Sequence, residues 1–144
     1  MNKEDSKVIL INLLAVTDGG QVTRAKAFLE RLRDHDSTSS LLILRRKKSL
    51  DFCDSVSGAK IIDVNLKNNF FRPWARLIWE NTKLLSIIGI HKPQIYLTFS
   101  HYLPLTVNKS IFSIVGVTNL APFSRSLLKN ESIFMKIKMI ILKL

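Results

Sequence analysis

Two apolar patterns alternate along this 144-residue chain. Unbroken apolar runs of strand length are typical of β-strands covered on both faces, as in a parallel sheet. Between them, apolar residues recur at intervals of three and four, which places them on one side of a helix. The alternation predicts an α/β fold, a Rossmann-like parallel sheet flanked by helices and joined by right-handed crossovers. The expected strands cover residues 8–16, 41–48, 60–66, 95–100 and 110–117.

Two helices are expected between these strands. The first covers residues 21–32, and its apolar side consists of Val22, Ala25, Leu29 and Leu32. The second begins near Pro73, because proline is tolerated in the first turn of a helix, and ends near Gly89. Its spacing predicts a core-facing set made of Trp74, Leu77, Ile78, Leu85 and Ile88.

A third helix is expected over residues 132–144. Lys129, Lys136 and Lys143 form one narrow stripe, while apolar residues cover most of the remaining circumference. A helix that is apolar nearly all round is expected to be buried on more than one side. A further stretch of chain, a partner or a membrane surface would cover it.

Charge narrows the classes of partner. The net charge is +11, and residues 71–144 carry 10 Lys and Arg against 2 Asp and Glu, or +8. This bias favours anionic partners such as phosphates, nucleic acid or an anionic membrane. We consider nucleic acid unsupported, because no RNA-binding signature accompanies the charge. A single cysteine, Cys53, excludes an internal disulfide, and a cytoplasmic location is expected, peripheral at the inner face of the membrane if the last helix binds lipid.

The ends of the predicted strands carry the candidate site, because ligands of parallel sheets bind at the carboxyl ends of the strands. The residues there are Gly19, Gly20, Ser100, His101, Tyr102, Thr118 and Asn119. Gly19 and Gly20 would let the backbone approach a ligand beside a helix N-terminus, although a tight turn capped by Thr17 or Asp18 explains them equally. His101 is a candidate acid–base group or a plain loop residue.

Other polar residues have simpler interpretations. Arg45 to Lys48 would bind phosphate or, as we favour, would lie in solvent where the second strand ends. Glu80 is expected to pair with Arg76 or Lys83 at helical spacing. Asn119 would be a ligand-binding amide or only a turn residue. No cluster of Cys and His has metal-ligand spacing, so no metal site is expected.

Three ordered segments resemble the N-terminal domain of GT-B glycosyltransferases of family 4. They are TDGG followed by RAKAFLERL, then KPQIYLTFSHYLPL, then SIFSIVGVTNLAPF, and together they cover most of the chain. The resemblance implies a sugar transfer from a nucleotide-sugar donor to a sugar or glycolipid acceptor. It also implies that this domain shapes the acceptor side of the cleft and binds no cofactor itself.

By the same resemblance, Gly19 and Gly20 match the family's glycine loop, and Ser100 to Tyr102 match the loop before its proline, here Pro104. Thr118 occupies the place of a histidine that is frequent in the family, so a histidine role is not expected there. We expect residues 1–144 to be one domain that lacks the donor-binding domain and is inactive alone. The alternative is a non-catalytic binding module that pairs with a separate donor domain or sits on an anionic membrane.

Overall fold

The computed structural model describes residues 7–17, 19–36, 38–46, 49–66, 72–100 and 102–116, with only the backbone of residues 72 and 73. Within these ranges the chain forms an all-parallel five-stranded sheet in the order β3-β2-β1-β4-β5. The strands are β1 (Val8–Asn12), β2 (Ser40–Arg46), β3 (Ala59–Val64), β4 (Ile95–Thr98) and β5 (Phe112–Val115). The helices are α1 (Gly19–His35), the short 3-10 helix η1 (Asp51–Ser55) and α2 (Arg72–His91). This is the α/β, Rossmann-like fold that the sequence pattern predicts.

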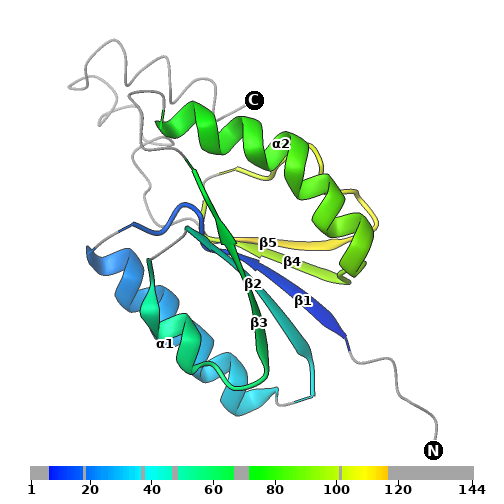
Figure 1. Cartoon of the computed structure of the whole chain (residues 1–144). Coiled ribbons are helices and arrows are strands. Elements are labelled where there is room, and N and C mark those ends of the chain that lie inside the picture. Colours follow the sequence, from blue (N-terminus) through cyan, green and yellow to red (C-terminus); the bar gives the residue numbers. More distant parts are fainter. Residues whose placement is uncertain are drawn as a thin grey trace, which may run out of the picture.

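The sheet is covered on both faces, with α2 above it and α1 below it in the view of Figure 1. Alternate residues of each central strand therefore enter two separate cores. The core under α1 contains Ile9, Ile11, Leu41, Ile43 and Leu97, together with Ala25 and Leu29 of α1. The core under α2 contains Leu10, Leu42, Leu44, Tyr96 and Leu84. Burial on both faces explains why β1 and β2 are unbroken apolar runs.

The first strand is shorter than the sequence pattern predicts. It ends at Asn12, not at Val16, although Leu13, Leu14 and Val16 remain buried. The side-chain Oδ1 of Asn12 accepts a hydrogen bond from the backbone N–H of Leu14 at 3.0 Å. A side chain that bonds its own backbone two residues on turns the chain out of the strand.

The predicted core face of α2 is partly wrong. Leu77 and Ile88 are half-buried, but Trp74, Ile78 and Leu85 are exposed. The buried side of α2 instead runs through Glu80 and Leu84, both fully buried. A charged residue thus occupies the centre of the packed face, and its hydrogen-bond partners decide the rotation of the helix.

The interpretation of Arg45 as a solvated residue is also wrong. Arg45 is buried, and its guanidinium donates to Asp63 Oδ1 at 2.8 Å, Asp54 Oδ2 at 2.9 Å and the carbonyl of Leu50 at 3.1 Å. These bonds join β2 to β3 and to η1, a helix that the sequence pattern did not predict. The two carboxylates raise the pKa of Arg45, so the residue is a structural cation. Lys47 and Lys48 lie outside the described residues.

Candidate functional site

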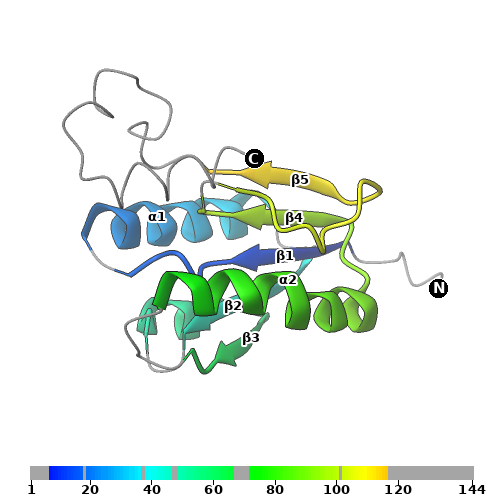
Figure 2. The same cartoon turned by 90° about the horizontal axis from the view of Figure 1, so that it is seen from above.

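The five strands are parallel, so all of them end at one edge of the sheet. Both α1 and α2 begin at this edge, as Figure 2 shows from above. The strand order reverses between β1 and β4, because β1 continues through α1 to β2 on one side while β4 lies on its other side. Ligands of open parallel sheets bind outside the carboxyl ends of the strands at such a reversal. The last residues of the two strands are Asn12 and Thr98. We call the surface beyond them the switch edge.

Gly19 and Gly20, two of the predicted site residues, open α1 at the switch edge. Gly19 has a φ of 56°, a left-handed conformation that favours glycine. A Cβ added at either glycine would meet nothing within 4 Å, so both face open space. The first turn of α1 contains no acidic residue, and the positive end of a helix dipole favours an anionic or hydroxyl-rich ligand.

Ser100 and Tyr102 follow β4 at the same edge. Ser100 is buried, and its Oγ lies 2.9 Å from the Oγ1 of Thr98 and donates to the carbonyl of Tyr102 at 2.8 Å. The Ser100 hydroxyl therefore holds the loop in place through hydrogen bonds within the protein. Tyr102 is half-buried, and its hydroxyl donates to Oε2 of Glu80. The structure thus makes Ser100 a loop-positioning residue and leaves the ring of Tyr102 to line the edge.

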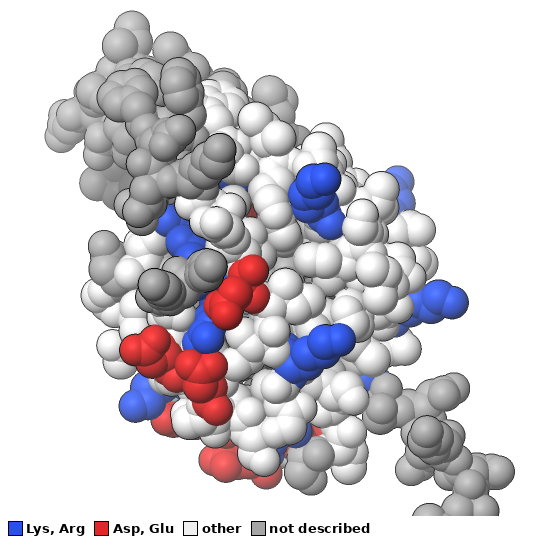
Figure 3. Space-filling view, viewed as in Figure 1, with Lys and Arg blue, Asp and Glu red and all other residues white. Residues whose placement is uncertain are grey.

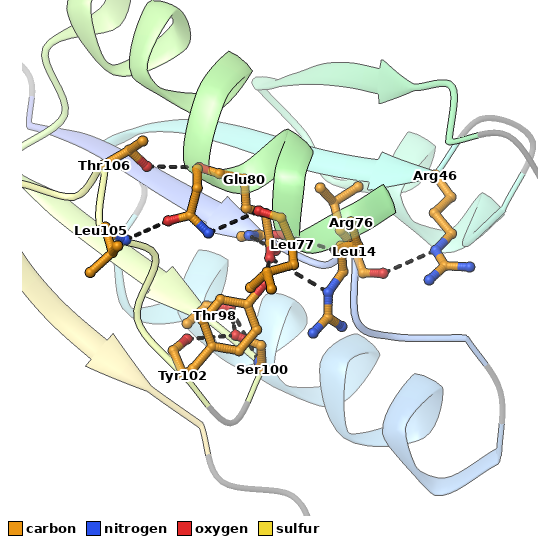
Figure 4. Close-up of polar contacts among 12 residues, drawn as sticks. Leu14, Arg46, Arg76, Leu77, Glu80, Thr98, Ser100, Tyr102, Leu105 and Thr106 are labelled. Atoms are coloured by element: carbon orange, nitrogen blue, oxygen red, sulfur yellow. Dashed lines mark hydrogen bonds and ion pairs between the residues drawn. The ribbon is translucent and has the colours of Figure 1, made fainter. Parts of the chain in front are cut away.

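A buried carboxylate lies under the switch edge (Figure 4). Glu80 is fully buried, and its Oε1 accepts a hydrogen bond from Asn12 Nδ2 at 2.7 Å. The same Nδ2 donates to the hydroxyl of Tyr96 at 2.8 Å. Glu80 with its two donors Asn12 and Tyr102 therefore ties α2 to β1 and to the loop after β4. Burial raises the pKa of Glu80, while Arg76 and the bond from Asn12 act in the opposite direction.

Arg76 supplies positive charge beside this carboxylate. Its Nε lies 3.5 Å from Glu80 Oε2, an ion-pair distance, although it makes no hydrogen bond there. Its guanidinium also lies over the ring of Tyr102, 5.4 Å from the ring centre, as in a cation–π contact. The predicted pairing of Glu80 with Arg76 is confirmed. A second cation, Arg46 at the end of β2, donates from Nε to the carbonyl of Leu14 at 3.0 Å.

The sequence-based site was thus located in part. Gly19, Gly20, Ser100 and Tyr102 lie at the switch edge, whereas His101, Thr118 and Asn119 lie outside the described residues. Sequence reasoning did not single out Asn12, and it assigned Glu80 only an ion pair. The available signal was one amide within an apolar strand and one carboxylate within an apolar helix, since isolated polar groups in cores need partners.

The remaining chemistry of the described part is sparse. A shallow pocket lies away from the switch edge, between α1 and η1, with Leu29, Glu30, Arg33 and Phe52 among its lining residues. Over the described ranges, no three His, Cys, Asp or Glu side chains are grouped so that they could hold a metal ion. None of the helices described here has the length and apolar character needed to cross a membrane.

Comparison with models of protein families, with characterised proteins and with solved structures found no match to this chain. Function must therefore be argued from the switch edge and from the sequence motifs.

Proposed function

We propose that this chain is the acceptor-side N-terminal domain of a glycosyltransferase that uses a nucleotide-sugar donor. The observation that carries the proposal is the switch edge itself. There the glycine pair Gly19-Gly20 and the loop residues Ser100 and Tyr102 meet the same edge of one parallel sheet. These are the segments whose motifs resemble the GT-B enzymes.

The chemistry of the edge suits a carbohydrate. Sugar hydroxyls need several donors and acceptors, and a sugar ring packs on an aromatic face. The backbone of the glycine pair that opens α1, the Tyr102 ring and the guanidinium of Arg76 supply such groups. Two cations, Arg46 and Arg76, would also favour an acceptor that bears phosphate.

The chain's residues would bind and orient the acceptor in this proposal. Glu80 does not take part directly, because both its oxygens are occupied by donors beneath the edge. Its role is to hold Tyr102 and Arg76 in place. The nucleotide-sugar is assigned to a second domain, as the family resemblance implies, so we expect no transfer or nucleotide-sugar hydrolysis by residues 1–144 alone.

Binding of the purified chain to an array of immobilised glycans tests the proposal. We expect retention of a subset of glycans, with Gly20→Val weakening it at least about tenfold because the added side chain fills the open approach. Gly89→Val is the matched control, since Gly89 also faces open space but lies near the far end of α2. Equal losses in both variants, or tight binding of nucleotide-sugars in calorimetry, would contradict the proposal.

A further inference from the structure

Three large apolar side chains lie exposed along one side of α2. Trp74 is 41% exposed, Ile78 is 62% exposed and Leu85 is 57% exposed. Their spacing of four and seven residues places them on one stripe, because both intervals complete nearly whole helical turns. The stripe spans about 16 Å along the helix at 1.5 Å per residue. The sequence pattern predicts a core position for all three, so their exposure requires an explanation.

A fourth apolar residue joins the stripe from the loop after β4. The backbone N–H of Leu105 donates to Oδ1 of Asn81 at 2.8 Å, and Asn81 lies between Ile78 and Leu85 on the same side of the helix. Leu105 is 92% exposed. Thr106 donates to the carbonyl of Glu80 at 2.7 Å and fixes the same loop. We call Trp74, Ile78, Leu85 and Leu105 the α2 patch; the loop that completes it is held in place by hydrogen bonds.

The half of the molecule that carries the α2 patch is basic. Among the described residues from 64 to 116, the exposed charged side chains are Lys83, Lys92 and Lys109, and the one acid, Glu80, is buried. The other described acids all fall within residues 30–63. In the view of Figure 3, the red side chains accordingly gather below α2, over the part that holds β3 and η1. Among the described residues, the patch therefore lies in the half of the molecule whose exposed charges are all positive.

We propose that the α2 patch is a docking surface for an anionic lipid bilayer. Apolar side chains of this kind insert into the boundary between head groups and acyl chains, and tryptophan favours that depth. Lys92 follows Leu85 by seven residues and continues the line of the stripe at the end of α2. A lysine beside such a surface strengthens binding to anionic lipids and makes it sensitive to salt. The α2 patch is distinct from residues 132–144, which the sequence pattern associates with a membrane and which lie outside the described residues. The proposal also does not depend on the proposed glycosyltransferase role.

A second copy of the chain is a poorer occupant. A stable protein interface buries about 800 Å² and 20–30 residues on each side, and four side chains fall well short of that. Two copies related by a two-fold axis would also bring like charges of the basic half together, which opposes association.

Co-sedimentation with vesicles tests the proposal, using phosphatidylcholine alone and phosphatidylcholine mixed with phosphatidylglycerol. We expect binding to the anionic vesicles only, weakening as salt is added. Replacing both Ile78 and Leu85 with serine should weaken this binding at least about tenfold, because the two apolar side chains that would enter the bilayer are removed. Ile114→Ser is the matched control, since Ile114 is 42% exposed on the opposite face of the sheet. Lys92→Glu should weaken binding more than Lys83→Glu, because Lys92 follows Leu85 by seven residues at the end of the stripe, while Lys83 lies on the other side of α2.

Fluorescence identifies which surface touches the lipid. The chain has two tryptophans, so Trp79→Phe leaves Trp74 as the only source of tryptophan fluorescence. Its emission should shift to the blue and be quenched by brominated lipid when anionic vesicles are added. Unchanged Trp74 emission, or equal binding by the Ile78→Ser, Leu85→Ser variant, would overturn the proposal. Binding lost only on truncation after Asn130 would assign the contact to the C-terminal segment, and patch-dependent dimers in light scattering would assign it to a second copy.

Discussion

Nδ2 of Asn12 lies 2.7 Å from Oε1 of Glu80, so the last residue of the central strand β1 holds the middle of α2. The two residues are 68 positions apart in the sequence. Their bond, together with the bond from Tyr102 to the other carboxylate oxygen, fixes the loop after β4 against the same helix. A buried and fully engaged polar group specifies one arrangement, because any other rotation of α2 would leave it without partners.

Replacing Glu80 should therefore be severe. We expect Glu80→Ala to lower the free energy of unfolding by about 3–5 kcal/mol, because it removes the buried acceptor of Asn12 and Tyr102 and the ion-pair partner of Arg76. Urea denaturation measures the change. Glu30→Ala is the control, since Glu30 and Lys26 form an exposed pair at 4.0 Å that contributes about 0.5 kcal/mol or less. Equal effects of the two substitutions would contradict the assigned role of Glu80.

The stability of the folded protein should depend on pH through the ionisation of Glu80. Burial raises the folded-state pKa of Glu80 above its usual 4.5, so the folded protein binds this proton more tightly than the unfolded chain does. The resulting stabilisation is complete below pH 4.5 and is lost as the pH rises through the folded-state pKa. The free energy of unfolding of wild type minus that of Glu80→Gln should fall with rising pH, by at most about 1.4 kcal/mol per pH unit.

Urea unfolding of both proteins at a series of pH values checks this. Asp36 does not disturb the comparison, although hydrogen bonds from Ser39 and Thr38 lower its pKa to about 2. It makes both proteins lose stability as the pH falls from 3.8 through about 2, and so cancels in the difference. A difference that rises with pH would mean that Asn12, Tyr102 and Arg76 favour the ionised carboxylate over the buried acid.

The parallel sheet with helices on both faces could be predicted from sequence, because strands that are buried on both faces are apolar along their whole length. β1 and β2 read as unbroken apolar runs, and their order with the helices implies parallel strands. The rotation of α2 could not be predicted in the same way. Its apolar residues lie all around the helix, so Trp74 and Leu84 are equally plausible core positions from sequence. The bonds that Glu80 accepts from residues far away in the sequence decide which side is buried.

In the candidate site, too, only the features that have a local sequence pattern could be predicted. Gly19 and Gly20 could be predicted because a glycine pair between a strand and a helix is a local pattern. The burial of Arg45 could not, because it depends on carboxylates that folding brings from Asp54 and Asp63. Asn12 likewise acquires its role only when α2 packs above β1.

Cys53 should be inert in the folded protein. It is fully buried, and desolvation raises the pKa of its thiol to about 11, so little nucleophilic thiolate forms at neutral pH. Labelling with a disulfide reagent should be slow in buffer and should reach one thiol per chain in urea. Fast labelling in buffer would show that η1 opens readily from the sheet and would contradict the tight packing of Cys53 against it.

The most direct test of the account maps ligands onto the switch edge by NMR. Isotope-labelled protein is titrated with a panel of monosaccharides and disaccharides, their phosphate esters, and a nucleoside diphosphate. We expect a saccharide to shift the amide signals of Gly19, Gly20, Ser100 and Tyr102, while those of Gly89 and Lys92 at the opposite end of the sheet stay unchanged. No shift with any saccharide, or shifts confined to the pocket between α1 and η1, would contradict it.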